Sequence, residues 1–264
     1  MNAPADEGLG VSKHRFMRVA ALYDIHGNLP ALEAVVPEIR RLGVDQILVG
    51  GDVLPGPMPR ETLLYLRNLD IPTLFIHGNG ESAVLDCLAG GSMGGLPEPA
   101  QEAVRWVAGQ LDAEEKRRLA HWPTTLRFEI GGLGEVLFCH ATPRSDTEIF
   151  TRLTPEKRLL RVFDELDVHL VVCGHTHMQF DRVIGRVRVV NAGSVGMPFG
   201  EPGAAWLLLG PDLQLRHTAY DQRTAAERIR DTDYPQAQEF AARSVLQPPS
   251  EEEMLHVFSK AAGE

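Results

Sequence analysis

The chain has 264 residues, of which 44% are hydrophobic and 23% are charged, and its formal net charge is −10. This length allows one large domain or two small ones with a sizeable core. The negative charge argues against a dedicated nucleic-acid binder, which would carry a basic face. No apolar run reaches the roughly 18 residues of a membrane-spanning helix. We therefore expect a globular protein that binds neither nucleic acid nor a membrane.

The N-terminal stretch MNAPADEGLGVSKHRF contains no apolar segment of the kind found in secretory signals. We expect residues 1–16 to form a flexible arm. The three cysteines, Cys87, Cys139 and Cys173, are odd in number, and two of them end apolar runs. This usage predicts buried thiols in a cytoplasmic protein rather than a disulfide framework.

From Met17 onward, apolar runs alternate with segments of helical period, which is the pattern of an α/β protein. The run at 17–23 is nearly continuous, as expected of a strand buried on both faces. Asn28 can cap the helix that follows it, and Gly43 ends that helix. Further strands are predicted at 46–50 and 72–76, with a helix between them at 61–69.

Residues 82–125 differ in character from the segments on either side. The loop GGSMGGLPEP is followed by apolar positions at helical spacing, which predict two helices. We expect a helical insertion that forms a lid over the site, with Trp106 and Trp122 in its small core.

The strand pattern then resumes and gives way to helices near the C-terminus. Gly185 is predicted to form the turn of a hairpin over 181–194. We expect residues 221–264 to be a helical tail packed on the domain, and Ser250 and Glu253 form a capping box for its last helix. The remaining strands are predicted at 126–130, 135–139, 168–174, 204–209 and 213–219, with a helix near 155–165.

Polar side chains with metal-binding capacity follow five of the predicted strands directly. Loops at the carboxyl ends of strands form the binding crevice of α/β proteins, so these side chains are predicted to meet at one edge. Seven oxygen and nitrogen ligands are too many for one catalytic zinc ion, but they suit two divalent metals bridged by a carboxylate. Manganese is favoured, with iron, zinc and nickel as alternatives. The candidate ligands are Asp24, His26, Asp52, Asn79, His140, His175 and His177.

In chain order these motifs read DIH, GD, GNGE, CH and GHTH. They resemble the signature of the calcineurin-like metallophosphoesterase superfamily, which is D-x-H, G-D, G-N-H-D/E, a strand-final His and G-H-x-H. The stretches GDVLPGPMP (51–59) and NAGSVGMP (191–198) resemble the small prokaryotic, phosphodiesterase-like branch of that family. The resemblance covers residues 17–220, which we expect to form the metallophosphoesterase domain.

The resemblance implies an α/β fold, a four-layer αββα sandwich with two mixed β-sheets. It also implies a hydrolase in which a hydroxide held between two metal ions attacks phosphorus. Asp24, His26 and His177 would bind one metal, and Asn79, His140 and His175 the other. Asp52 would bridge the two metals, and Asp52, Asn79 and His140 are the residues expected to act most directly in catalysis.

The sequence departs from the family signature at the general acid. In many members the residue after the metal-binding Asn is a His that protonates the leaving oxygen, whereas this chain has Gly80. We expect Gly80→His to supply the missing proton donor if Glu81 can orient the new ring. His77 is better explained as an ordinary strand-end residue, and His121 is a weaker candidate.

The leading hypothesis is a dinuclear metal-dependent phosphoesterase that acts on a phosphodiester or a small phosphorylated metabolite or nucleotide. A protein phosphatase would need an open groove, which the insertion at 82–125 is expected to roof. A non-catalytic scaffold on the same fold is the alternative from another functional class. Such a scaffold could lose ligands without penalty, and all seven are present here, which favours an enzyme.

Overall fold

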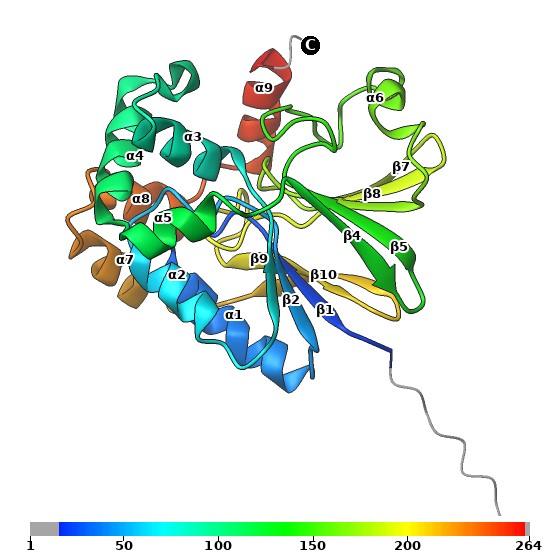
Figure 1. The fold of residues 1–264 in the computed structure, drawn as a ribbon, viewed down its shortest axis with the longest axis horizontal. Helices are drawn as coiled ribbons and strands as arrows, with labels where there is room; N and C mark the ends of the chain where they lie inside the picture. Colours follow the sequence, from blue (N-terminus) through cyan, green and yellow to red (C-terminus); the bar gives the residue numbers. More distant parts are fainter. Residues whose placement is uncertain (1–15, 262–264) are drawn as a thin grey trace, which may run out of the picture.

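The computed structural model describes residues 16–261, so the expected arm at 1–16 lies outside the described residues apart from Phe16. Two five-stranded sheets face each other at the centre of the molecule (Figure 1). The first sheet has the order β10-β9-β1-β2-β3, and the second β4-β5-β6-β8-β7. The strands are β1 (Val19–Leu22), β2 (Gln46–Val49), β3 (Thr73–Phe75), β4 (Thr125–Ile130), β5 (Gly134–Cys139), β6 (Leu170–Cys173), β7 (Phe180–Ile184), β8 (Val187–Asn191), β9 (Ala204–Leu209) and β10 (Leu213–Thr218).

Each sheet contains three parallel strands and two antiparallel strands. In the first sheet β1, β2 and β3 run parallel, while β9 and β10 are antiparallel to their neighbours. In the second sheet β5, β6 and β8 run parallel, and β4 and β7 close the two edges as antiparallel strands. Both sheets are therefore mixed, as predicted.

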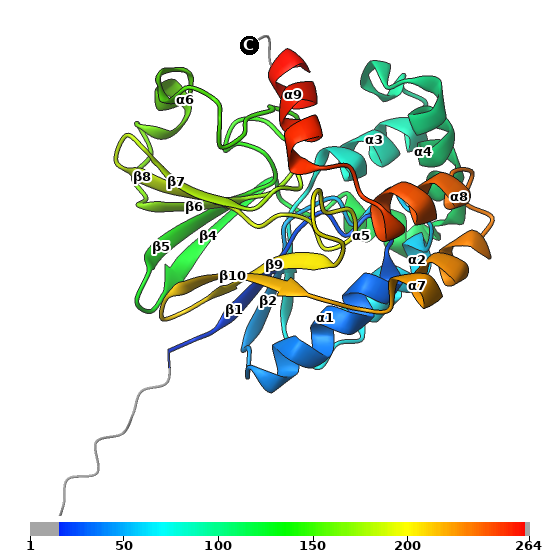
Figure 2. The same cartoon turned by 180° about the vertical axis from the view of Figure 1, so that it is seen from behind.

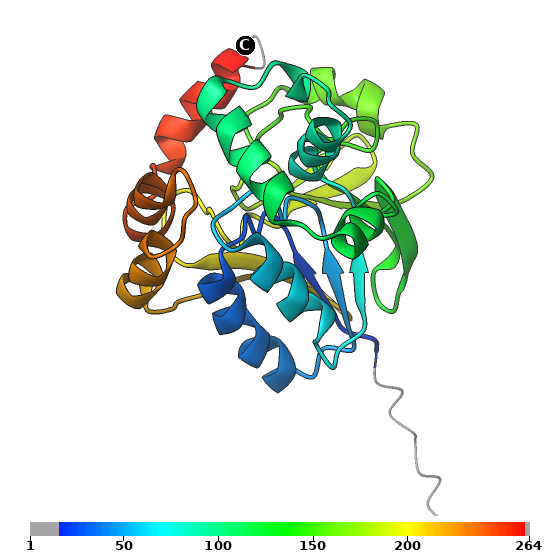
Figure 3. The same ribbon diagram turned by 60° about the vertical axis from the view of Figure 1, so that its left-hand side comes forward.

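Helices cover the outer faces of the two sheets, and Figures 1 and 3 show most of them on the side of the first sheet. Only α6 packs on the outer face of the second sheet among the described helices. This arrangement confirms the four-layer αββα sandwich. The helices are α1 (Leu29–Arg41), α2 (Pro59–Arg67), α3 (Asn79–Leu88), α4 (Glu98–Gln110), α5 (Ala113–Leu119), α6 (Glu156–Phe163), α7 (Gln222–Arg230), α8 (Ala237–Phe240) and α9 (Glu251–Ala261), with a 3-10 turn η1 (Met93–Gly95) and a π-helical turn η2 (Ala241–Leu246).

The alternation of side chains along the strands separates the core into layers. Val19 and Ala21 of β1 pack between the sheets, whereas Ala20 and Leu22 pack against the helices. In β6, Val172 packs between the sheets, while its neighbour Cys173 faces the outer layer with α6. Because successive side chains on a strand point to opposite faces, a strand with apolar residues on both faces is buried on both sides.

The local signals around α1 act as predicted. The Asn28 side chain accepts a hydrogen bond from the Ala31 N–H at 3.2 Å and so caps the helix. Its amide nitrogen donates to the Gly196 carbonyl at 2.9 Å. Asn28 is therefore a structural cap that also fixes the loop after β8.

The segment 82–125 contains α4 and α5, and its apolar side chains join the main core rather than a separate small one. Val104 and Val107 of α4 belong to the same buried cluster as the apolar residues of α1. Trp122 stacks on Phe75 of β3, with ring centroids 4.6 Å apart, and Trp106 packs edge-on against Tyr234. Both tryptophans are packing residues, as predicted, but they connect the segment to the sheet and to the C-terminal region. That the segment acts as a lid remains a prediction.

The C-terminal helices α7, α8 and α9 pack on the rest of the molecule. Figures 1 and 2 both place α8 beside α4, and the Gln236 side chain donates a hydrogen bond to the Pro99 carbonyl. The Ser250 hydroxyl accepts from the Glu253 N–H at 3.2 Å, which supplies the predicted cap of α9. Within residues 16–261, no helix has both the length and the apolar character needed to cross a membrane.

Candidate metal centre

The carboxyl ends of strands from both sheets converge on one crevice. The loop after β1 carries Asp24 and His26, and the loop after β6 carries His175 and His177. Asp52 follows β2, Asn79 begins α3 just after β3, and His140 follows β5. The structure thus brings all seven residues predicted from the strand ends to the same edge.

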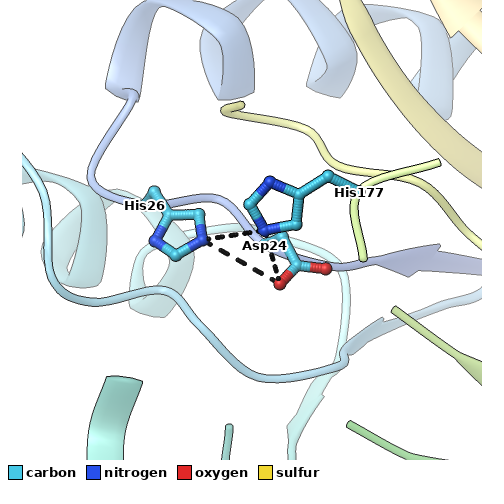
Figure 4. Close-up of side chains that lie close together, drawn as sticks. All are labelled: Asp24, His26 and His177. Carbon is cyan, nitrogen blue, oxygen red and sulfur yellow. Dashed lines mark hydrogen bonds and ion pairs between the residues drawn. The ribbon is translucent and has the colours of Figure 1, made fainter. Parts of the chain in front are cut away.

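A first group consists of Asp24, His26 and His177, shown in Figure 4. The Nε2 atoms of the two histidines lie 3.2 Å apart. The Asp24 Oδ1 atom lies 3.3 Å from the His177 Nε2 and 3.9 Å from the His26 Nε2. Three potential ligand atoms therefore face one point.

A second group consists of Asp24, Asp52 and His140. The His140 Nε2 lies 3.5 Å from the Asp52 Oδ1, 3.8 Å from the Asp24 Oδ1 and 3.0 Å from the Asn79 Oδ1. The other oxygen of Asp52, Oδ2, lies 3.7 Å from the His26 Nε2. Asp52 thus presents one oxygen to each group, and Asp24 is shared by both.

His175 lies beside the second group but outside both sets of close ligand atoms among the described residues. Its ring packs edge-on against His140, with centroids 5.2 Å apart. Its backbone N–H donates to the Asp24 Oδ2 at 2.9 Å. His175 therefore fixes the orientation of Asp24 through its backbone while its ring stays next to His140.

The rings of His26, His140 and His177 each have one nitrogen in contact with a backbone carbonyl. The Nδ1 atoms lie 3.2 Å from the Pro55 oxygen for His26, 3.0 Å from the Gly50 oxygen for His140 and 2.9 Å from the Met197 oxygen for His177. A neutral imidazole that donates through Nδ1 keeps a lone pair on Nε2. Such outer contacts fix the tautomer of metal-binding histidines, so each of these rings presents a lone pair to the centre when it is neutral.

The donor set fits divalent cations. Asp24 Oδ1 is buried and has no hydrogen-bond donor in the described part of the chain. Buried acceptors of this kind are rare and call for an ion or water to satisfy them. The Nε2 atoms of His26 and His177 also face each other at 3.2 Å, and a cation between them would stabilise this arrangement of two neutral rings. Imidazole, carboxylate and amide donors without a thiolate suit manganese, iron, zinc or nickel.

The pKa values of the groups in the crevice also favour a bound divalent cation. Burial lowers the pKa of His26 to about 3 and that of His175 to about 4, so both rings are neutral at pH 7. Burial would raise the pKa of Asp24, but its contacts with neighbouring histidines, above all His177, outweigh burial and lower the pKa. Burial and the neighbouring Asp24 carboxylate raise the pKa of Asp52. Two adjacent carboxylates are stabilised when a cation offsets their repulsion.

The backbone is strained at the same residues. Six non-glycine residues of the described chain have a positive φ, and all but Met93 are candidate ligands. This conformation is uncommon for residues with a side chain and persists where the surrounding structure imposes it. Its concentration here marks the crevice as a functional site. The five are Asp24 (φ 53°), His26 (48°), Asp52 (51°), His175 (67°) and His177 (56°).

Glu81 has a structural role that the sequence analysis missed. Its fully buried carboxylate accepts hydrogen bonds from the backbone N–H groups of Asp52 (2.8 Å), Leu54 (2.9 Å) and Gly78 (2.8 Å). It therefore joins the loop after β2 to the loop after β3. Burial and the nearby Asp52 carboxylate raise its pKa to about 7. The signal in the sequence was an acidic residue three positions into a helix, which is a capping pattern.

The structure leaves no room for the side chain of Gly80→His unless the neighbouring backbone shifts, so the expected proton donor would be sterically opposed. A Cβ atom on Gly80 would lie 2.0 Å from the Leu54 carbonyl oxygen and 2.9 Å from the Pro55 ring. The Gly80 N–H also donates to the Asp52 Oδ1 at 2.7 Å. Glycine is required here because the loop after β2 passes directly over the first turn of α3.

The other candidate proton donors have structural contacts elsewhere. The His77 Nε2 lies 2.8 Å from the Leu119 carbonyl oxygen, and this contact connects β3 to α5. His121 is exposed, and its Nδ1 lies 2.6 Å from the Arg117 oxygen. The reading of His77 as an ordinary strand-end residue agrees with this contact.

The NAGSVGMP stretch (191–198) contacts the backbone and side chains of the first group of candidate ligands. The Ser194 hydroxyl donates to the Asp24 carbonyl at 2.7 Å, and the Gly196 N–H donates to the same oxygen at 3.0 Å. The Met197 carbonyl contacts the His177 ring. This loop therefore positions residues of the first group without contributing a ligand of its own.

A cavity of about 570 Å³ opens at the centre, with His26, Asp52 and Asn79 in its lining. Its other walls come from α4 and from the C-terminal segment around η2 and α9. A ligand held in this cavity would contact both groups of candidate ligands.

Several known proteins are similar to this chain over most of its length. An uncharacterized protein of Methanocaldococcus jannaschii is 27% identical over 238 residues, which cover 83% of this chain and 94% of that protein. A solved structure of a hypothetical protein from Pyrococcus horikoshii matches with a TM-score of 0.76 at 20% identity, covering 89% of this chain and 100% of that one. A metallophosphoesterase from Sphaerobacter thermophilus matches with a TM-score of 0.68 at 26% identity, covering 87% and 99%.

Residues 17–210 match the calcineurin-like phosphoesterase superfamily domain. This match spans most of the chain and includes every candidate ligand. The resemblance inferred from the motifs, including that to the small prokaryotic branch, is thereby confirmed. The chain belongs to the calcineurin-like phosphoesterase superfamily.

Proposed function

We propose that the protein is a dinuclear metal-dependent phosphoesterase that hydrolyses a phosphodiester or a small phosphorylated metabolite or nucleotide. Asp24, His26 and His177 would hold one divalent metal, and Asn79, His140 and His175 the other. Asp52 would bridge them, since its two oxygens face different groups. Manganese is our first choice of metal.

The observation that carries the proposal is the buried Asp24 Oδ1, which accepts no hydrogen bond from the described residues and lies between 3.3 and 3.9 Å from the Nε2 atoms of His26, His140 and His177. When bound, two metal ions supply positive charge for the phosphoryl oxygens and acidify a water molecule for attack. The strained ligand loops favour an enzyme over a scaffold, because strain of this kind is concentrated at active sites. The walls that α4 and the C-terminal segment add to the cavity favour small substrates over phosphoproteins.

The protein's own groups would keep the site ready for reaction. Carbonyl contacts hold the His26, His140 and His177 rings, and the Gly80 N–H holds Asp52. Groups fixed before the reaction need no reorganisation during it. No side chain occupies the general-acid position at Gly80, so the leaving oxygen would receive no proton from that residue. Aryl esters such as p-nitrophenyl diesters should therefore react much faster than serine phosphate.

The first test is hydrolysis of bis-p-nitrophenyl phosphate by metal-stripped protein before and after addition of manganese. Activity should appear only with the metal and disappear with EDTA. Asp24→Asn should lower it at least about a hundredfold, since even outer contacts of metal sites can be worth 10–100-fold. Asp70→Asn, at an exposed carboxylate paired with Arg40, is the matched control and should behave as wild type. Equal activity with EDTA, or none with manganese, would contradict the proposal.

A further inference from the structure

The cavity at the metal centre is much larger than a phosphoryl group needs. Its volume of about 570 Å³ falls within the roughly 300–1,000 Å³ of pockets that enclose an organic ligand. Three of the candidate metal ligands, His26, Asp52 and Asn79, form part of its lining. The remaining space must therefore take the organic part of a substrate.

The walls of this space are mainly apolar. Ala100 and Val104 line it from α4, Phe240 from α8 and Met254 from α9. Phe199 stands next to the centre, where its ring stacks on His177 with centroids 5.3 Å apart. Sugar hydroxyl groups placed against these apolar side chains would lose their hydrogen bonds to water, although Gln236, Glu239 and Ser244 also line the cavity.

The charge of the lining limits the number of phosphate groups. Among the residues that line the cavity, Arg243 is the one lysine or arginine, and it lies 3.8 Å from Glu253. Polyphosphates and multiply phosphorylated ligands need several cationic groups or metal ions along their length. The cavity instead suits a ligand with one phosphoryl group at the metals and an uncharged organic group.

One wall of the cavity, which includes Phe240 and Met254, comes from a part of the chain beyond the family match. Residues of η2 and α9 follow the matched segment 17–210. The segment before α8 meets α4 through the Gln236–Pro99 hydrogen bond and the edge-on packing of Tyr234 on Trp106, with ring centroids 5.5 Å apart. The π-helical turn of η2 directs Arg243 and Ser244 to the lining, and such turns are frequent at functional sites.

We infer that α4 and the C-terminal segment form a specificity pocket for phosphoesters with a single phosphoryl group and a bulky, apolar organic group, such as an aryl or branched alkyl diester. This inference rests on the proposed function, because it takes the metal centre as the place where the phosphoryl group binds.

The test uses phosphonates, which retain the charged head group but contain a P–C bond and cannot be hydrolysed. Binding of naphthylmethylphosphonate and of methylphosphonate to the manganese-loaded protein is measured by calorimetry. The naphthyl compound should bind at least about tenfold more tightly, because burying an aromatic ring commonly adds that much affinity. Equal affinities for the two compounds would overturn the inference.

Two variants fill the cavity from opposite walls. Ala100→Trp on α4 and Met254→Trp on α9 should each reduce the preference for the naphthyl compound to near one. Glu102→Trp, at an exposed position on the same helix as Ala100, adds the same side chain outside the lining and should keep the preference. A folded Ala100→Trp or Met254→Trp protein with the full preference would place the organic group elsewhere.

The binding result is independent of catalysis. Suppose that the wild-type protein prefers the naphthyl compound and that the filling variants lose this preference, while bis-p-nitrophenyl phosphate is not hydrolysed. That result would support the specificity pocket and contradict the proposed activity. If hydrolysis is present and the preference is absent, the activity stands and the pocket fails.

Discussion

At the scale of single residues, the candidate ligands could be predicted because each directly follows a buried apolar strand. Other properties of the same residues could not. Asp24 contributes to both groups, and its Oδ1 lacks a hydrogen-bond partner among the described residues. The positive φ of Asp24 and His26 could not be predicted from the sequence either, because neither residue type favours a left-handed backbone in the way that glycine does. Glu81 was linked to a missing histidine, whereas it binds three backbone N–H groups.

Asp52 lies between the two groups of candidate ligands, so its loss should affect both metals. Asp52→Ala should remove both metals and lower activity at least about a hundredfold, because one carboxylate faces both groups. Elemental analysis of the folded variant measures the loss, with Asp70→Ala as the control. Full metal occupancy in Asp52→Ala would rule out a bridging role.

At the scale of elements, strand and helix positions followed from periodicity and capping residues. The predicted hairpin around Gly185 is β7 and β8, and the helix capped by Asn28 is α1. The contact between the loop after β2 and α3 was beyond prediction, because it depends on how two separate segments cross. That contact explains Gly80 and excludes a side chain there.

This crossing predicts the cost of a substitution. Gly80→His should destabilise the protein by about 2 kcal/mol or more, since overpacking against a backbone carbonyl typically costs 1–3 kcal/mol. Urea unfolding of the metal-free protein measures the change. Gly109→His is the control, because a Cβ there meets no atom within 4 Å, and it should be tolerated. Equal stability of the two variants would mean that the loop moves aside easily.

At the scale of the whole molecule, the αββα architecture was predictable because the order of the motifs specified a family with that fold. The shape of the cavity was not. It requires contact between Pro99 and Gln236, which are 137 residues apart, and between α4 and helices outside the family match. Sequence periodicity shows that these helices are amphipathic but not which partner covers each face.

The central claim is that two metal ions at this crevice support phosphoester hydrolysis. The most direct measurement is a titration of metal-stripped protein with manganese while bis-p-nitrophenyl phosphate hydrolysis is followed. Our account predicts that the rate rises with added metal and levels off near two equivalents per chain. A plateau at one equivalent would contradict the dinuclear centre, and a folded protein that stays inactive at every metal concentration would contradict the claim as a whole.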